Sequence, residues 1–316
     1  MSSRTVLSLC LILLVGVPSA ALAEKRVALT FDDVPRSAGA FLSPDERTAR
    51  IIAALEESGV EQAAFFVNPG NLSTADGANG DAHISAYVAA GHVIANHSFS
   101  HPHLRTSDVE TYLADIDRAE AWLKGREGYR PWFRFPYLDE GGRDLDKRDA
   151  IRADLAARGL RNGYVTADGS DWHLEQLTLD AKAAGKTINM TQLARLYIGA
   201  QLSALEYHDQ LARDTIGRSP AHVLLMHETD LAALFLPELV DEMRKQGWTI
   251  IAAEEAYADP IAAEQPDVPY AYGTLIGSMA WERDVPPPAY PLWMSTDMMS
   301  LLFDRRVVEK AAETED

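Results

Sequence analysis

Two histidines four residues apart, His97 and His101, are the residues of this 316-residue chain best suited to bind a metal ion. In an H-x-x-x-H spacing both rings lie on the same side if the backbone makes a helical turn, although Pro102 favours an irregular one. A carboxylate from another part of the chain would complete three ligands and leave positions open for water and substrate. Asp33 is the best candidate for this third ligand, and a turn or helix-start aspartate is the alternative.

Asp32, the neighbour of Asp33, is suited to a different task. A bound divalent ion lowers the pKa of water toward neutrality, and a carboxylate beside that water can take its proton as a general base. Arg134 would keep Asp32 ionised and oriented, because a nearby cation stabilises the charged form of a carboxylate. A structural ion pair at the barrel rim, with no catalytic function, is the alternative for Arg134.

His227 ends an apolar run and is a candidate general acid. A histidine in that position is more often a hydrogen-bonded core residue, which is the alternative interpretation. Beside a metal site it would instead protonate a departing amine. Asp171 would raise the pKa of His227 and determine which ring nitrogen carries the proton.

These polar residues follow short apolar runs that we expect to be β-strands. The seven predicted strands are Arg26–Phe31, Gln62–Val67, His92–Asn96, Trp132–Phe135, Gly163–Ala167, His222–Met226 and Trp248–Ala253. Amphipathic stretches between them are typical of parallel strands joined by helices. The carboxyl ends of parallel barrel strands share one face, where active sites are built. We therefore predict an α/β fold, a distorted (β/α) barrel of seven or eight parallel strands whose polar clusters meet in one cleft.

The first predicted helix has the clearest boundaries. Ser43 is suited to the N-cap, Pro44 to the first helical position and Glu46 to a capping box, and Gly59 should end the helix. Residues 68–82 are rich in Gly, Asn, Asp and Ser and predict a surface loop. The other predicted helices are Ser107–Lys124, Asp146–Arg158, Thr191–Thr215 and Leu236–Lys245.

The two ends of the chain predict separate segments. Residues 1–23 combine Arg4, an apolar run and a closing Ala-Leu-Ala, as in a secretory signal peptide, which predicts a periplasmic or secreted protein without membrane insertion. We expect a catalytic domain at residues 24–258 and a C-terminal extension at residues 259–316. The aromatic residues of the extension are expected to pack on the barrel, and lining a glycan groove is the alternative.

Cysteine usage and charge exclude several function classes. Cys10 is the only cysteine and lies within the predicted signal peptide, so the mature chain would have neither disulfides nor cysteine metal ligands. The net charge of the whole chain is −18, which makes nucleic acid an unsuitable partner. Protein partners cannot be predicted from the sequence.

Five motifs in order resemble those of the polysaccharide deacetylases, carbohydrate esterase family 4 with its NodB-homology domain. They are Thr30-Phe31-Asp32-Asp33, His97-Ser98-Phe99-Ser100-His101, Arg134-Phe135-Pro136-Tyr137, Asp168-Gly169-Ser170-Asp171-Trp172 and Leu225-Met226-His227. The resemblance covers residues 26 to about 255. It implies a distorted (β/α) barrel that binds one divalent ion, most often Zn²⁺, with Co²⁺, Ni²⁺, Mn²⁺ or Fe²⁺ as alternatives.

The resemblance also implies functions for individual residues. Asp33, His97 and His101 would bind the metal, Asp32 with Arg134 would act as base, and His227 with Asp171 would act as acid. The backbone N–H of Tyr137 would stabilise an oxyanion, and Pro136, Trp172 and Leu225 would line the substrate site. Phe135 replaces a common proline and Leu138 a common glycine, so the loop around Tyr137 is expected to have its own shape. The long interval between Trp172 and His227 predicts an added helix near the cleft.

The sequence thus predicts a metal-dependent hydrolase that removes N-acetyl groups from an exported or cell-envelope glycan and releases acetate. An O-acetyl esterase would use the same residues. A hydrolase of small amides or formamides is a second alternative, if the added segments close the groove. A non-catalytic carbohydrate-binding protein is the alternative from another class, but it has no need for both aspartates, both histidines, Arg134 and His227 together.

Overall fold

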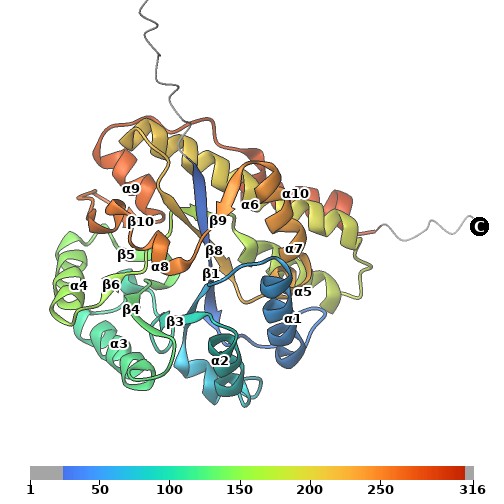
Figure 1. The fold of residues 1–316 in the computed structure, drawn as a ribbon, viewed down its shortest axis with the longest axis horizontal. Helices are drawn as coiled ribbons and strands as arrows, with labels where there is room; N and C mark the ends of the chain where they lie inside the picture. Colours follow the sequence, from blue (N-terminus) through green and yellow to red (C-terminus); the bar gives the residue numbers. More distant parts are fainter. Residues whose placement is uncertain (1–23, 310–316) are drawn as a thin grey trace, which may run out of the picture.

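The computed structural model describes residues 24–309, and parallel strands surrounded by helices form its centre (Figure 1). The strands of the main sheet are β1 Lys25–Val34, β2 Ala64–Val67, β3 Val93–Asn96, β4 Tyr129–Phe133, β6 Arg161–Asn162, β7 Ala167–Asp168, β8 Ala221–His227 and β9 Trp248–Ile250. Their order is β6-β4-β3-β2-β1-β8-β7, with β9 paired to β1, and every pairing is parallel. The predicted signal peptide lies outside the described residues.

The sheet curls because one stretch of chain joins its two ends. Strands β6 and β7 are connected by residues 163–166 only, yet β6 pairs with β4 and β7 pairs with β8. Between them, the Gly163 N–H donates to Phe133 O (2.7 Å) and the Thr166 N–H donates to Val223 O (3.0 Å). The single strand predicted at residues 163–167 is therefore two short strands. The predicted distorted (β/α) barrel is confirmed.

Helices flank the strands on the outside of the barrel (Figure 1). Their bounds are α1 Pro44–Glu57, α2 Gly80–Ala89, α3 Val109–Leu123, α4 Leu145–Ala157, α5 Asp171–Ala183, α6 Met190–Ile216, α7 Asp230–Lys245, α8 Ala253–Ala256, α9 Leu275–Glu282 and α10 Thr296–Leu302. Ser43 caps α1 with the predicted capping box. The long interval after Trp172 contains two helices, α5 and α6, which pack on each other and on β7 or β8.

Two predictions, the surface loop at residues 68–82 and the helix at Leu236–Lys245, are wrong in part. Residues 68–82 contain the short helix η1 Pro69–Ser73 and the start of α2. The side chain of Asn79, the N-cap residue of α2, makes no capping hydrogen bond. Helix α7 begins at Asp230, earlier than Leu236. Thr229 caps it, and Pro237 lies inside it. A proline inside a helix removes one helical hydrogen bond, but the packing of α7 on α1 and α6 outweighs that local cost.

Side chains of the parallel strands alternate between two cores. On β8, Leu224 and Met226 belong to the core between the barrel and helices α1, α6 and α7. Val223 and Leu225 belong to a second core with Phe66, Trp132 and other residues of the barrel interior. His227 continues the series of Val223 and Leu225, so it follows from the alternation that its side chain lies on the interior face.

The described part of the C-terminal segment, residues 259–309, packs on the barrel. Its strand β10 Ala271–Tyr272 pairs antiparallel with β5 Asp139–Gly142. The Leu275 N–H donates to Val165 O (2.9 Å), and Ile276 and Met279 are buried in the interior core. Figure 1 shows β10 and α9 beside β5 on one side of the barrel. Among the described residues, no helix has the length and apolar character needed to cross a membrane.

Candidate active site

The strand register brings the candidate residues to one end of the barrel. Asp32 on β1 is the direct Cα partner of His227 on β8. Strand β3 pairs with β2 through Asn96, and His97 follows immediately. Arg134 follows β4. Because all these strands are parallel, their carboxyl ends form one rim, and the predicted clusters meet there.

Asp33, His97 and His101 form a compact cluster. One potential ligand atom from each lies within 4.8 Å of the others. The Asp33 Oδ1 atom lies 3.1 Å from His101 Nε2 and 3.6 Å from His97 Nε2. The backbone between the histidines has positive φ at Ser98 (67°) and at His101 (58°), so the rings meet through an irregular loop and not through a helical turn.

The polar atoms of this cluster fit a divalent cation. The Nδ1 of His97 lies 2.9 Å from Arg134 O, which places the proton on Nδ1 and leaves a lone pair on Nε2. Asp33 Oδ1 is buried and has no hydrogen-bond partner among the described residues. A buried carboxylate oxygen opposite an imidazole lone pair is unfavourable unless a cation lies between them. Two imidazoles and one carboxylate are also a donor set that zinc and similar ions accept.

Asp32 and Arg134 form a buried ion pair in the barrel interior. The guanidinium of Arg134 also donates to Gly163 O (2.7 Å), to Thr30 Oγ1 (2.9 Å) and to the hydroxyl of Tyr257 (2.7 Å). Burial raises the pKa of Asp32 to about 6, although Arg134 acts to lower it. One oxygen of Asp32 is held by Arg134, and the other lies 3.6 Å from His97 Nε2.

His227 is held by Asp171, which is fully buried at the start of α5. The two carboxylate oxygens of Asp171 accept from the backbone N–H of His227 (2.8 Å) and bind its ring Nδ1 (2.7 Å). Nε2 is therefore the ring nitrogen that remains for chemistry. Burial lowers the pKa of His227, but the charge and hydrogen bond of Asp171, together with the charge of Asp33, outweigh burial and raise the pKa to about 9.

The predicted substrate-site residues differ in accessibility. Trp172 and Tyr137 are each 45% exposed, whereas Leu225 and Pro136 are buried. Tyr137 and Leu138 both have positive φ, 59° and 51°. A non-glycine residue rarely adopts this conformation, so the loop around Tyr137 carries backbone strain at the cleft.

Three residues with clear positions in the site are missing from the sequence-based prediction. Arg36 donates to Asp33 Oδ2 (2.6 Å) and so leaves Oδ1 for another partner. The hydroxyl of Tyr257 accepts a hydrogen bond from the guanidinium of Arg134. Asp139 accepts from the backbone N–H groups of Arg105 (3.1 Å) and Gly141 (3.0 Å), which ties two loops together. None of the three lies within the five motifs, and their contacts are visible only in the folded chain.

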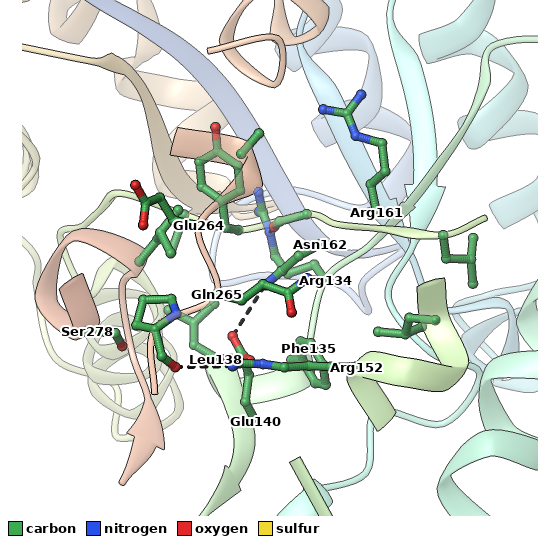
Figure 2. A pocket seen from close by; sticks show the side chains of 18 of the residues that line it. Arg134, Phe135, Leu138, Glu140, Arg152, Arg161, Asn162, Glu264, Gln265 and Ser278 are labelled. Carbon is green, nitrogen blue, oxygen red and sulfur yellow. Dashed lines mark hydrogen bonds and ion pairs between the residues drawn. The ribbon is translucent and has the colours of Figure 1, made fainter. Parts of the chain in front are cut away.

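Two cavities lie near these residues. One of about 320 Å³ adjoins the metal-ligand cluster, and its lining includes Asp33, His101 and Arg36. Figure 2 shows another, of about 280 Å³, between β5, α4 and the C-terminal segment. Of the predicted site residues, only Arg134 lines this second cavity, and two of its charged residues, Glu140 and Arg152, pair with each other (2.7 Å). The first cavity therefore gives access to the candidate metal centre.

Comparison with known proteins agrees with this arrangement. Residues 19–160 match the family model described as polysaccharide deacetylase. Over this part of its sequence the chain is similar to the polysaccharide deacetylase family. It is 24% identical over 236 residues to a chitin deacetylase of Colletotrichum lindemuthianum, which covers 74% of this chain and 79% of that relative.

Further relatives of this family were found. A peptidoglycan-N-acetylglucosamine deacetylase of Bacillus cereus is 35% identical over 115 residues, covering 36% of this chain and 37% of that relative. The solved structure of the C. lindemuthianum chitin deacetylase has a TM-score of 0.50 at 20% identity, covering 77% of this chain and 96% of the other. That likeness supports the fold alone. The similarity to the family model and to these relatives supports a polysaccharide deacetylase activity.

Proposed function

We propose that this chain removes N-acetyl groups from an exported or cell-envelope polysaccharide or oligosaccharide, with one divalent ion, most often Zn²⁺, bound by Asp33, His97 and His101. The observation that carries the proposal is the meeting of this cluster with two supported acid–base groups at one rim of the barrel. A binding protein without catalysis would not need a buried carboxylate–guanidinium pair and a buried carboxylate–imidazole pair beside a metal site.

Each polar residue has a distinct task in this mechanism. A divalent ion held by the three ligands would supply Lewis-acid chemistry, lowering the pKa of a water molecule and polarising the substrate carbonyl. Asp32, oriented by Arg134, takes a proton from the attacking water. His227, kept protonated by Asp171, gives a proton from Nε2 to the nitrogen of the breaking amide bond. Acetate and a free amine result.

The substrate site and the chain organisation complete the proposal. The backbone N–H of Tyr137 would stabilise the oxyanion, and Pro136, Trp172 and Leu225 would shape the site around the acetyl group. Residues 24–258 would form the catalytic domain, with residues 259–316 as an extension. Residues 1–23 would act as a signal peptide and direct the protein to the periplasm or the exterior.

Acetate release is the direct test of this function. We expect the protein to release acetate from at least one of chitooligosaccharides, peptidoglycan and acetylxylan, and to lose this activity when a chelator removes the metal. Re-addition of Zn²⁺ should restore it. N-acetylated and O-acetylated substrates assayed in parallel separate the amidase from the esterase. A metal-loaded protein that releases no acetate from any of these glycans would contradict the proposal.

Replacement of Asp171 by asparagine should move the alkaline limb of the pH profile to lower pH. Burial lowers the pKa of His227, and Asp171 is the main group that raises it against burial, to about 9, so removal of the Asp171 charge lowers that pKa and deprotonates the acid at lower pH. We expect kcat/KM to fall, and the limb to shift by about one to two pH units. The pH dependence of kcat/KM measures this, with exposed Asp117→Asn as control, and an unshifted limb would contradict the assignment.

A further inference from the structure

The C-terminal segment places a tyrosine beside the loop of Tyr137. Tyr272 lies on β10 opposite Asp139 of β5. The N–H of the next residue, Gly273, donates to Leu138 O (3.0 Å). The pairing of β10 with β5 thus attaches a residue from beyond the predicted catalytic domain directly to the rim of the candidate active site.

A continuous series of ring contacts begins at the metal-ligand cluster. The ring of His101 lies 4.4 Å from that of Tyr137, in an edge-to-face arrangement. On its other side Tyr137 stacks on His103, with ring centroids 3.5 Å apart and planes inclined by 12°. These contacts lead away from Asp33 along one direction of the rim.

Arg105 extends the series from His103 to the C-terminal segment. His103 Nδ1 lies 3.3 Å from the buried Asp139, which also binds the backbone N–H of Arg105. The guanidinium of Arg105 lies 5.7 Å from the ring centroid of Tyr272 and 3.4 Å from the hydroxyl of Tyr270. Tyr137, His103, Arg105 and Tyr272 therefore form one connected surface, which we call the rim strip.

The rings at the two ends of the rim strip remain accessible. Tyr137 and Tyr272 are each 45% exposed, and the side chain of Arg105 is 42% exposed. An aromatic residue that serves only to pack is normally covered, as Phe133 is in this protein. Neighbouring exposed aromatic rings beside a catalytic cleft indicate a binding surface.

Sugars are the chemical class that such a surface binds. The axial C–H groups of a pyranose form an apolar, weakly positive face, which matches the negative face of an aromatic ring. Arg105 adds hydrogen-bond donors for hydroxyl or acetyl oxygens. The net charge of −18 would repel a polyanionic glycan, so the occupant is a neutral one.

We propose that the rim strip binds the sugar residues next to the one being deacetylated, with Tyr272 as a stacking platform supplied by the C-terminal extension. The proposal rests on the deacetylase function above and specifies its substrate as a neutral N-acetylated oligomer or polymer. The enzyme then prefers long chains over single sugars, because only a chain reaches from the metal cluster to Tyr272.

Tyr272→Ala tests this proposal through chain-length preference. We expect kcat/KM for a chitin pentamer to fall about 3- to 10-fold, mainly through KM, with a much smaller change for a small chromogenic acetate ester. Tyr272→Phe should retain the preference, since it keeps the ring. Trp281→Ala is the matched control, because Trp281 is a 50% exposed aromatic of the same extension on α9 and outside the rim strip.

Binding of the pentamer, measured by titration calorimetry, separates this proposal from the deacetylase function. Weaker binding of the pentamer by Tyr272→Ala than by wild type or Tyr272→Phe would support the rim strip. This holds even if the wild type releases no acetate, because a lack of acetate release would reject only the proposed reaction. The rim strip is rejected if Tyr272→Ala binds the pentamer as wild type does. It is also rejected if the variant loses activity equally on the pentamer and the ester.

Discussion

Asp32→Asn is expected to lower kcat by about 10²–10⁴-fold while the protein keeps its metal ion. Asp32 lies beside the ligand cluster, with one oxygen bound by Arg134 and the other facing His97. An amide of the same shape can still accept from Arg134 but cannot take a proton from water. Because Asp33, His97 and His101 are untouched, the substitution should remove the proton transfer and leave the binding of metal and substrate.

Two measurements make this prediction decisive. Elemental analysis should find equal metal in the variant and the wild type, and KM should change little. Asp117→Asn is a suitable control, since Asp117 pairs with Arg158 (2.6 Å) on the surface and should not affect turnover. Near-normal turnover by Asp32→Asn would remove Asp32 from the mechanism, whereas loss of the metal would show that this carboxylate is itself a ligand.

The neighbouring carboxylates Asp32 and Asp33 are suited to different tasks by their surroundings. Burial acts to raise the pKa of both carboxyl groups. For Asp32 burial prevails and the pKa is about 6, whereas His101 and Arg36 outweigh it for Asp33 and hold its pKa well below the usual range. A group that titrates near neutrality can accept a proton, and one that stays ionised can hold a cation. Asp33 has a positive φ (67°), and both carboxylates lie 3.6 Å from His97 Nε2.

The fold and the central site residues could be predicted because their signals are local. Apolar runs indicate strands, and polar residues at strand ends identify the catalytic face of a parallel barrel. Asp32 and His227, almost two hundred positions apart, are therefore expected in one cleft, and the structure pairs them directly on β1 and β8. The capping box of Ser43 is similarly local and was predicted correctly.

Features that depend on distant contacts could not be predicted. Tyr272 reaches the rim only because β10 pairs with β5. These strands have two and four residues, which is too short for a recognisable alternation of apolar and polar side chains. Tyr257 is ordinary in sequence until the fold places its hydroxyl 2.7 Å from the guanidinium of Arg134. Helix α7 continues through Pro237 because tertiary packing outweighs a local penalty. Local propensity thus predicts the barrel better than the C-terminal extension. The extension is the part that we expect to select the substrate.

His97→Ala is expected to remove the metal ion and with it nearly all activity. His97 is almost fully buried, and its Nδ1 contact with Arg134 O orients Nε2 toward Asp33. Loss of an outer partner of a metal ligand already costs about 10–100-fold in metal affinity, so loss of a ligand should cost more than about 100-fold. Asp33 and His101 alone would leave too few protein ligands for a stable site.

Elemental analysis after dialysis and a thermal melt with and without Zn²⁺ measure this loss. The wild type should retain one equivalent and melt at a higher temperature with the ion, because a ligand that binds only the folded state stabilises it. His97→Ala should show neither effect. His173→Ala is the matched control, since His173 contacts Ser300 (2.8 Å) and lies outside the cluster. A His97→Ala protein that tightly holds one equivalent would refute the ligand assignment, because the three-residue cluster would then not be the metal site.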